Sequence, residues 1–252
     1  LNAIFVRIAP AVGRLGLISQ SGAMVSSIID WAAASGIGFS EVLSLGDMAD
    51  VDVGDALNLL ATDPQTSAIL MYLESVPAPR KFMSAARAAA RLKRVIAVKP
   101  GRHEQAARAA HTHTGALAGA DRVVDAALKR AGIIRVPDLD DLFNAAAITA
   151  RFPPMSRGPV AIVTNGGGAG VLAVDQLLDQ GCELATLGQA TLAELDRQLP
   201  PTWSHANPVD IIGDAPPDRY VKAVQTVALD PGVDALLVMN CPTGVALPEP
   251  AA

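Results

Sequence analysis

Short apolar runs that alternate with helix-like segments constrain the fold of this chain more than any other feature. The run AILMYL at residues 68–73 carries no charged side chain. Such uninterrupted runs are typical of central strands in a parallel sheet, which are buried on both faces. Half of the residues are hydrophobic and only 4% are aromatic, a composition that suits parallel strands covered by Ala-rich helices. The sequence therefore predicts an α/β protein with doubly wound parallel sheets.

The alternation continues through both halves of the chain. Gly36 and Gly132 follow expected helices, and Asp63-Pro64 ends another, because the residue before a proline is pushed out of the helical region. Strands are expected at residues 14–20, 41–45, 68–73, 94–98, 133–136 and 159–164. Helices are expected at residues 24–34, 51–61, 79–92, 121–131, 139–151 and 169–180.

A segment rich in proline and glycine divides the chain into two expected domains. With 252 residues the chain is longer than most single domains and can bury two cores. The clearest linker is Phe152-Pro153-Pro154 followed by Ser156-Arg157-Gly158. We expect one domain at residues 1–152 and a second at residues 153–252. The chain starts at a leucine and stops soon after a strand-like run, so we expect a piece of a longer polypeptide, with the second domain truncated at its C-terminal end.

The second half partly repeats the first. Residues 18–22 align with residues 163–167 at an offset of 145. Further along, residues 45–47, 63–64 and 69–71 align with residues 212–214, 230–231 and 236–238, all at an offset of 167. Three separate matches at one offset predict an internal duplication with about 22 extra residues in the second copy. In that copy Cys241 takes the position of Glu74.

Each copy contains a strand, a turn of small residues and a helix in that order. In the first copy the turn is Ser21-Gly22-Ala23, where Ser21 can cap the helix and Gly22 allows a ligand to approach the backbone. In the second copy the turn is Gly166-Gly167-Gly168. This arrangement points unpaired backbone N–H groups at an anion, although the same three elements also occur without any ligand. The two turns are therefore candidate phosphate sites.

A histidine-rich loop lies between two expected elements of the first copy. Residues 111–119 read HTHTGALAG, with two imidazoles in a run of small residues. Two solvated loop histidines are the alternative reading. Two helix N-termini aimed at one histidine would instead suit a phosphoenzyme, because neutral imidazole attacks an activated phosphoryl group at neutral pH. Glu74, at the carboxyl end of an expected strand, could hold the other ring nitrogen and fix the reactive tautomer.

Charge and cysteine content exclude several classes of function. The net charge is −5 and no long run of Lys or Arg occurs, so the chain lacks the electrostatic signature of a nucleic-acid or membrane-surface protein. Cys182 and Cys241 are the two cysteines, and their spacing suggests neither a disulfide framework nor a metal site. No secretory signal or membrane-spanning run is present in the sequence, and a reducing cytoplasm fits best.

Five motifs together resemble a known family. They are GRLGLISQSGAM, ILMYLES, HTGALAG with the following AGIIRV, IVTNGGGAGVLAVD and NPVDIIGDA, and they occur in the family's order over essentially the whole chain. They are similar to motifs of the ADP-forming acyl-CoA synthetases, relatives of succinyl-CoA synthetase. The resemblance implies two flavodoxin-like domains of the succinyl-CoA synthetase type.

The resemblance also implies an activity and roles for particular residues. Members of the family interconvert acyl-CoA, phosphate and ADP with a free acid, CoA and ATP through a phosphohistidine. By resemblance His113, which directly precedes Thr114-Gly115-Ala116, is the phosphorylated residue and Glu74 is its carboxylate partner. The phosphate-holding helices would start at Ser21-Gly22-Ala23 and at Gly166-Gly167-Gly168. His111 lies outside the core motif, and a solvated side chain is expected for His103.

The resemblance implies partners that this chain does not contain. The family's CoA-binding domain and its ATP-grasp domain, which carries nucleotide and magnesium, are absent from the sequence. We therefore expect CoA, ATP or ADP and Mg²⁺ to bind through domains of the same or a partner chain. In this chain we expect no metal site and no permanently bound cofactor, and phosphate is expected at the helix N-termini. The substrate would be a small carboxylic acid.

Two other classes of function stay open at this point. The chain could be the synthetase-like regulatory region of a protein acetyltransferase, although the presence of His113 favours an active enzyme. It could also be a non-catalytic α/β interaction module. The acyl group, the choice between ATP and GTP, and homo-oligomerisation are not determined by the sequence. For Asn207-Pro208-Val209-Asp210, a family signature without an evident chemical role, we expect a structural turn.

Overall fold

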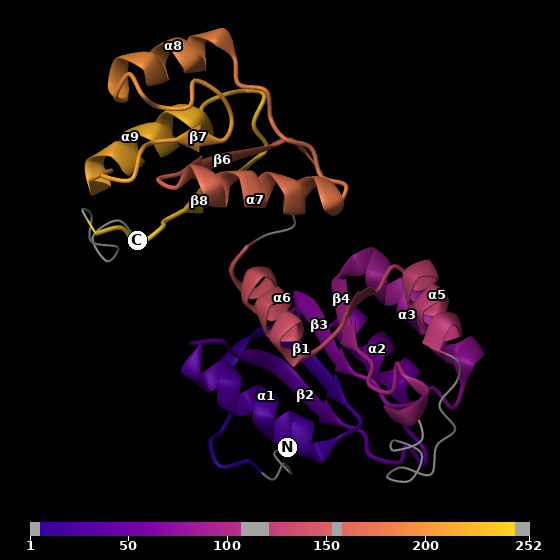
Figure 1. Cartoon of the computed structure of the whole chain (residues 1–252). Helices are drawn as coiled ribbons and strands as arrows, with labels where there is room; N and C mark the ends of the chain where they lie inside the picture. Colours follow the sequence, from indigo (N-terminus) through magenta and orange to yellow (C-terminus); the bar gives the residue numbers. More distant parts are fainter. Residues whose placement is uncertain (1–5, 107–120, 153–157, 245–252) are drawn as a thin grey trace. The chain divides into compact units, whose positions relative to one another are not determined.

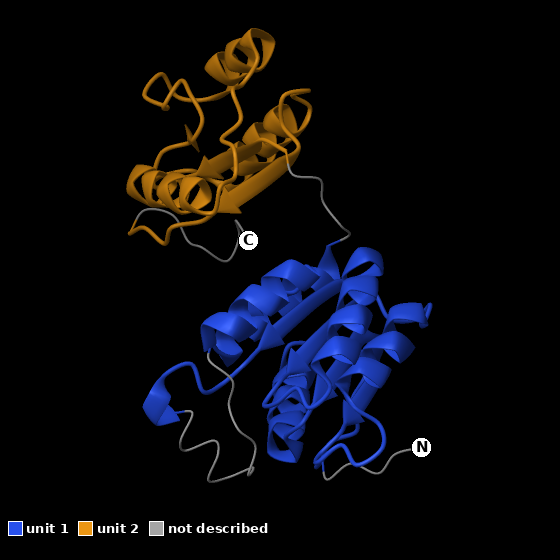
Figure 2. Cartoon of the chain, turned by 90° about the vertical axis from the view of Figure 1, so that its right-hand side faces the viewer, with its two compact units in different colours: residues 1–154 blue, residues 155–252 orange. Residues whose placement is uncertain are grey.

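A computed structural model describes residues 6–106, 121–152 and 158–244 of the chain. The chain divides into two compact units, Leu1–Pro154 and Met155–Ala252, which Figure 2 colours separately. Each unit has its own sheet, and each is described by itself below. No helix among the described residues is long and apolar enough to cross a lipid bilayer.

The first unit is built on a five-stranded parallel sheet. Its strands lie in the order β2-β1-β3-β4-β5 and pair in parallel throughout. The strands are β1 (Val12–Ser19), β2 (Phe39–Ser44), β3 (Ala68–Tyr72), β4 (Arg94–Val98) and β5 (Ile134–Val136). The helices are α1 (Gly22–Ala34), α2 (Val53–Thr62), α3 (Pro79–Leu92), α5 (Asp121–Ala131) and α6 (Leu139–Arg151).

Helices cover both faces of this sheet (Figure 1). On one face α2, α3 and α5 bury Ile69 and Met71 of β3 together with the odd-numbered residues of β4. On the other face α1 and α6 bury Ala68 and Leu70 together with Ile96 and Val98 of β4. Successive side chains of a strand point to opposite faces, so apolar residues at every position of β3 supply both cores. The uninterrupted run AILMYL is therefore explained by a central strand.

The second unit repeats the start of the first with an insertion. Its elements are β6 (Val160–Thr164), α7 (Gly167–Asp179), α8 (Gln189–Gln198), β7 (Val209–Asp210), α9 (Pro217–Ala228) and β8 (Ala235–Met239). The strands lie in the order β7-β6-β8 and pair in parallel, as β2-β1-β3 do. The offset of 145 carries α1 onto α7, and the offset of 167 carries β3 onto β8. The structure thus agrees with an internal duplication, and α8 lies in the extra residues.

The predicted fold class is confirmed, with differences at particular boundaries. Helix α7 begins at Gly167 and not at residue 169, because Gly166 already has the extended backbone of an N-cap residue. The expected turn at residues 207–210 is partly strand, since Val209–Asp210 forms β7. The Asn207 side chain supports that turn: its amide accepts from the Ile162 N–H at 2.9 Å and donates to the Ala185 carbonyl at 2.8 Å. Asn207, the first residue of the Asn207-Pro208-Val209-Asp210 signature, therefore has a structural role.

Candidate functional site

The turn between β1 and α1 presents an open helix N-terminus. Ser21 is the N-cap, with extended backbone, and its hydroxyl accepts from the Met24 N–H at 3.4 Å. The first N–H groups of a helix have no partner inside the helix. A Cβ added to Gly22 would have no other atom within 4 Å, so the space in front of this terminus is free. The turn can therefore receive an anion without any rearrangement of its own side chains.

Ser19 braces the turn from inside the protein. Its side chain is fully buried at the end of β1. The hydroxyl donates to the Ser21 carbonyl at 2.8 Å and accepts from the Ser21 N–H at 3.1 Å. Two hydrogen bonds to one residue hold the backbone of the cap, which fixes the direction in which the first turn of α1 points.

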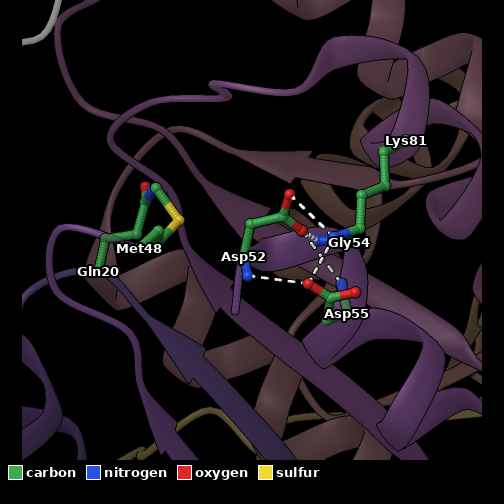
Figure 3. Close-up of polar contacts among 6 residues, drawn as sticks. All are labelled: Gln20, Met48, Asp52, Gly54, Asp55 and Lys81. Atoms are coloured by element: carbon green, nitrogen blue, oxygen red, sulfur yellow. Dashed lines mark hydrogen bonds and ion pairs between the residues drawn. The ribbon is translucent and has the colours of Figure 1, made fainter. Parts of the chain in front are cut away.

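Gln20 links the same turn to the end of β3. Its Oε1 accepts from the Glu74 N–H and, at 2.9 Å, from the Ser75 N–H. Its Nε2 donates to the Ser75 carbonyl at 3.0 Å and contacts Met48 Sδ at 3.2 Å. Figure 3 shows Gln20 beside Met48. One buried amide therefore ties β1, the segment after β2 and the segment after β3 to one another.

The segment after β2 is held in place by charged residues at the start of α2. Asp52 caps this helix by accepting from the N–H groups of Gly54 and Asp55, and the Asp55 side chain accepts from the Asp52 N–H at 3.0 Å. Lys81 of α3 approaches Asp55 at 2.5 Å and Asp52 at 3.3 Å (Figure 3). The hydrogen bond between Lys81 and Asp55 lowers the pKa of Asp55 and raises the pKa of Lys81. These contacts fix the start of α2, and with it the preceding segment that contains Met48.

A depression of about 720 Å³ opens at the carboxyl edge of the first sheet. Glu74 contributes to its wall and is half-buried. Its carboxylate accepts no hydrogen bond and forms no ion pair with any residue that the structure describes. The lining residues are Gln20, Ser21, Gly22, Ala23, Gly46, Asp47, Met48, Glu74, Ser75 and Pro77.

A second, more apolar cavity of about 260 Å³ adjoins the depression and shares Glu74 and Ser75 with it. It lies between α3 and α5, and Phe82 and Leu128 contribute to its walls. Lys99, which follows β4, also lines this cavity and is only 7% exposed. Burial lowers the pKa of the Lys99 ammonium, as expected for a cation withdrawn from water. Glu74 therefore stands between a polar depression and an apolar cavity.

The equivalent turn of the second unit has the same scaffold. Thr164 repeats Ser19: its hydroxyl donates to the Gly166 carbonyl at 3.3 Å and accepts from the Gly166 N–H at 3.1 Å. Asn165 repeats Gln20, accepting from the Cys241 N–H at 2.7 Å and donating to the Cys241 carbonyl at 2.9 Å. The strand end and the helix start are thus held in the same way in both units.

The surroundings of this second turn are different. A Cβ at Gly166 would lie 2.6 Å from Cys241 Sγ, and a Cβ at Gly167 would lie 2.7 Å from Asp210 Oδ2. The Asp210 carboxylate therefore stands beside the first residue of α7. Only at Gly168 is there again no atom within 4 Å of an added Cβ. A side chain at either of the first two positions would require the Cys241 thiol or the Asp210 carboxylate to shift.

The structure brings together most of the residues that the sequence singled out, unit by unit. Ser21, Gly22, Ala23 and Glu74 line one depression. Gly166 caps α7, and Gly167 and Gly168 begin it. His103 is exposed, as expected. His111 and His113 lie outside the described residues, and the role of His113 stays a prediction.

Sequence reasoning did not single out two residues of the site. Gln20 holds the peptide that carries Glu74, and Lys99 lines the adjoining cavity. The alignment at an offset of 145 already placed an amide side chain, Gln20 or Asn165, at the same point in both copies. That repeated amide was a signal for a structural hydrogen bond. Nothing in the sequence marked Lys99, because its burial depends on helices distant in the chain.

The fold and the two turns define a class of protein: an α/β protein with a helix N-terminus at the carboxyl edge of each parallel sheet. Two family profiles place the chain within that class. The succinyl-CoA ligase like flavodoxin domain matches residues 12–149. The Ligase-CoA domain matches residues 160–250. Since the first match alone covers more than half of the sequence, the chain belongs to the succinyl-CoA ligase-like family.

Similar proteins include ADP-forming ligases from archaea. Acetate–CoA ligase (ADP-forming) I of Archaeoglobus fulgidus is 40% identical over 96% of this chain and 35% of its own length. The alpha subunit of acetate–CoA ligase (ADP-forming) I of Pyrococcus furiosus is 38% identical over 99% of this chain and 54% of its own length.

A solved structure with the same fold is that of dinucleotide forming acetyl-coenzyme A synthetase 1 of Ca. Korarchaeum cryptofilum, in complex with phosphate and ADP. It matches with a TM-score of 0.90 and 36% identity over 95% of this chain and 52% of that one. The chain thus spans between about a third and about a half of the length of these relatives.

Proposed function

We propose that this chain is the phosphohistidine-bearing part of an ADP-forming acyl-CoA ligase. The reaction interconverts acyl-CoA, ADP and phosphate with a free acid, CoA and ATP. Family membership supports the reaction class, and the similar proteins are named as ADP-forming CoA ligases. In this proposal residues 1–152 form the domain that carries the phosphorylated loop, and residues 153–252 belong to the second domain. The regulatory and interaction-module alternatives find no support among the relatives named above.

One observation carries the proposal: an open helix N-terminus lines the same depression as a carboxylate that has no hydrogen-bond partner among the described residues. Glu74 makes no hydrogen bond through its carboxylate with any described residue, and Gly22 faces free space. A helix N-terminus stabilises a dianion, whereas a carboxylate beside it repels one. The pair suits a site in which an imidazole lies between phosphate and carboxylate, with the ring accepting the phosphoryl group on one side and donating a proton to Glu74 on the other.

We assign that imidazole to His113. In the direction that consumes ATP, a ring nitrogen of neutral His113 attacks the γ-phosphorus, an N–P bond forms and the bond to the departing ADP oxygen breaks. The other ring nitrogen keeps its N–H and donates it to Glu74, which fixes the tautomer and offsets the positive charge on the ring. In the opposite direction ADP takes the phosphoryl group back. Ser21, Gly22 and Ala23 hold the phosphate, and Gly166, Gly167 and Gly168 form the second phosphate-holding helix start.

The remaining substrates bind elsewhere in the complete enzyme. We assign CoA to a CoA-binding domain, and nucleotide with Mg²⁺ to an ATP-grasp domain, in the same or a partner chain. The relatives support such partners, because one of them is named an alpha subunit. A small carboxylic acid is the expected acyl substrate. The unpaired state of Cys182 and Cys241 fits a reducing cytoplasm.

Phosphate labelling of the full-length protein that contains this chain tests the assignment. With γ-labelled ATP and Mg²⁺, the wild-type protein should take up a label that is stable in base and labile in acid. His113→Ala should abolish both the label and acyl-CoA-dependent ATP formation. His111→Ala is the matched control, two residues away in the same loop, and should leave both largely intact. Label in the His113→Ala protein would disprove the assignment, and an unlabelled wild-type protein would favour the regulatory module.

A further inference from the structure

The side-chain amide of Gln20 extends the hydrogen bonding of the first sheet beyond its last strand residues. Its backbone N–H still donates to the Tyr72 carbonyl at 3.2 Å, as a strand residue would. Beyond that point the Gln20 side chain continues the hydrogen bonding. It accepts from the N–H groups of Glu74 and Ser75 and donates to the Ser75 carbonyl. Gln20 is 7% exposed, so these bonds form away from water. A buried amide with its oxygen and nitrogen both satisfied holds its partners in one position.

Glu74 is therefore held at its backbone while its carboxylate is available. Gln20 Oε1 accepts hydrogen bonds from the N–H groups of Glu74 and Ser75, and so holds the peptide groups on either side of the Glu74 Cα. On the opposite side of β3, the Leu73 N–H donates to the Val98 carbonyl at 3.0 Å. The carboxylate forms no hydrogen bond with any residue that the structure describes. A fixed main chain, with a carboxylate that has no hydrogen-bond partner within the described part of the chain, is the arrangement expected for an acidic group that binds another residue or a ligand.

The second unit shows which part of this arrangement is general. Asn165 binds the N–H and the carbonyl of Cys241, the residue in the position of Glu74. An amide at this point is therefore part of the duplicated scaffold. Gln20 is one methylene longer than Asn165 and also reaches Ser75, the next residue along the chain. The longer reach occurs in the unit that has a carboxylate to orient.

We propose that Gln20 is a positioning residue that acts through Glu74, fixing the carboxylate in the orientation that receives the imidazole of His113. This inference rests on the proposed function, because it assigns Gln20 to the same phosphorylation site. Gln20 touches neither phosphate nor imidazole in this role. Its effect is to restrict the Glu74 main chain, so that fewer side-chain conformations compete with the one that binds the ring.

The test uses single-turnover phosphorylation of the full-length protein and four variants: Gln20→Met, Gln20→Asn, Glu74→Gln and the double variant Gln20→Met/Glu74→Gln. Gln20→Met keeps the length of the side chain and removes its hydrogen bonds, and should slow phosphorylation about tenfold, as loss of an outer-shell partner does. Gln20→Asn keeps an amide of the kind found in the second unit and should retain an intermediate rate. The double variant Gln20→Met/Glu74→Gln should be no slower than Glu74→Gln alone, because Gln20 acts only through Glu74. Multiplicative losses in the double variant would overturn the proposal.

A matched control separates positioning from general loss of stability. Thr66 is 3% exposed and its hydroxyl bonds to Ser40 at 2.7 Å and to Asp63 at 2.5 Å, before the start of β3 and so at the opposite edge of the sheet. Thr66→Val also removes buried hydrogen bonds from the first unit, but should leave the phosphorylation rate of the folded protein unchanged. Equal slowing by Thr66→Val and Gln20→Met would overturn the role of Gln20.

The same experiment distinguishes the two levels of inference. An unlabelled wild-type protein would overturn the proposed function and the role of Gln20 with it. A labelled wild-type protein together with an unchanged rate in Gln20→Met would overturn the role of Gln20 alone. Three results together would support that role. Gln20→Met slows phosphorylation, Gln20→Asn slows it less, and Gln20→Met causes no further slowing in a protein that already carries Glu74→Gln.

Discussion

The turns at the start of α1 and α7 are built on one scaffold and differ in what faces the helix. In both, a buried hydroxyl, Ser19 or Thr164, holds the cap residue. In both, an amide, Gln20 or Asn165, ties the turn to the end of the next strand in the sheet. The first turn opens onto a depression of about 720 Å³. In the second, the Asp210 carboxylate lies beside the first residue of the helix, 2.7 Å from where a Cβ at Gly167 would stand.

This difference shows that the duplication preserved a scaffold and not a site. The residue equivalent to Asp210 in the first unit is Ser44, because Asp210 pairs with Thr164 as Ser44 pairs with Ser19. Ser44 brings no charge to α1. The residue equivalent to Glu74 in the second unit is Cys241. In the first unit Asp47, after β2, and Glu74, after β3, line the depression at the helix start, whereas in the second unit Asp210 lies within β7, beside the first residue of α7. Two helix starts that look alike in sequence therefore have different electrostatic surroundings.

The largest effect is expected from Gly22→Val. A Cβ at this position meets no protein atom within 4 Å, so the variant should fold normally, but a β-branched side chain would fill the space in front of the helix. Phosphate binding at this turn should weaken about 100-fold, or about 2.7 kcal/mol. A phosphate titration followed through the amide resonances of Ala23 in the full-length protein would measure it.

Gly168→Val is the matched control for this prediction. It also introduces a branched side chain into free space at a helix start. Because Asp210 already opposes an anion at α7, phosphate affinity there should change less than at Gly22. Equal losses at both turns would show that the two helix starts bind phosphate alike, and the contrast drawn here would be wrong.

A loss of about 10- to 100-fold in the phosphorylation rate is expected for Glu74→Gln, as loss of a group that orients a reactive ligand typically gives. Glutamine can still accept a hydrogen bond but no longer offsets positive charge on the imidazole. The equivalent change in the second unit, Cys241→Ser, should leave the rate within about twofold. Quenched-flow labelling of both full-length variants measures the two rates. A Cys241→Ser protein as slow as Glu74→Gln would contradict the unequal roles of the two units.

Much of the fold followed from sequence because the signals are local. The runs at residues 68–73 and 95–98 are apolar at every position, and only a strand buried on both faces needs that. Gly36 and Gly132 have positive φ values of 65° and 83°, which a glycine adopts without strain, and they end α1 and α5 as expected. Helix α8 was missed because it lies among the inserted residues, for which the first copy offers no counterpart.

The site was less predictable, because its contacts join residues distant in sequence. The open turn at Gly22 and the position of Glu74 at a strand end could be expected from local pattern. The hydrogen bonds of Gln20 to residues 54 and 55 positions later could not, since they depend on the order β2-β1-β3 in the sheet. Nor could the position of the Asp210 carboxylate beside Gly167. In the sequence the two glycine turns therefore appeared more alike than they are.

A smaller effect is expected from Ser21→Ala. The hydroxyl caps α1 through a hydrogen bond of 3.4 Å to the Met24 N–H, and it lies in the wall of the depression. Its loss should weaken phosphate binding by about 1 kcal/mol, or roughly fivefold. The helix should also lose a cap, at a cost of about 1 kcal/mol in the free energy of unfolding. Ser21→Thr keeps the hydroxyl and should recover most of both, whereas an unchanged phosphate affinity in Ser21→Ala would remove Ser21 from the anion site.

The smallest effect, and one of opposite sign, is expected from Asp210→Asn. Asp210 Oδ1 accepts from the Ile212 N–H at 2.9 Å, and an asparagine can keep that hydrogen bond, so the turn after β7 should stay intact. The substitution removes a negative charge from the N-terminus of α7, where a charge contributes about 0.3–1 kcal/mol. Phosphate affinity at Gly168 should therefore rise by roughly two- to fivefold, while affinity at Gly22 stays the same. The amide shifts of the two turns in one titration would measure both values. If affinity at Gly168 does not rise, the charge of Asp210 is not what separates the turns, and the close approach of Cys241 to Gly166 becomes the better explanation.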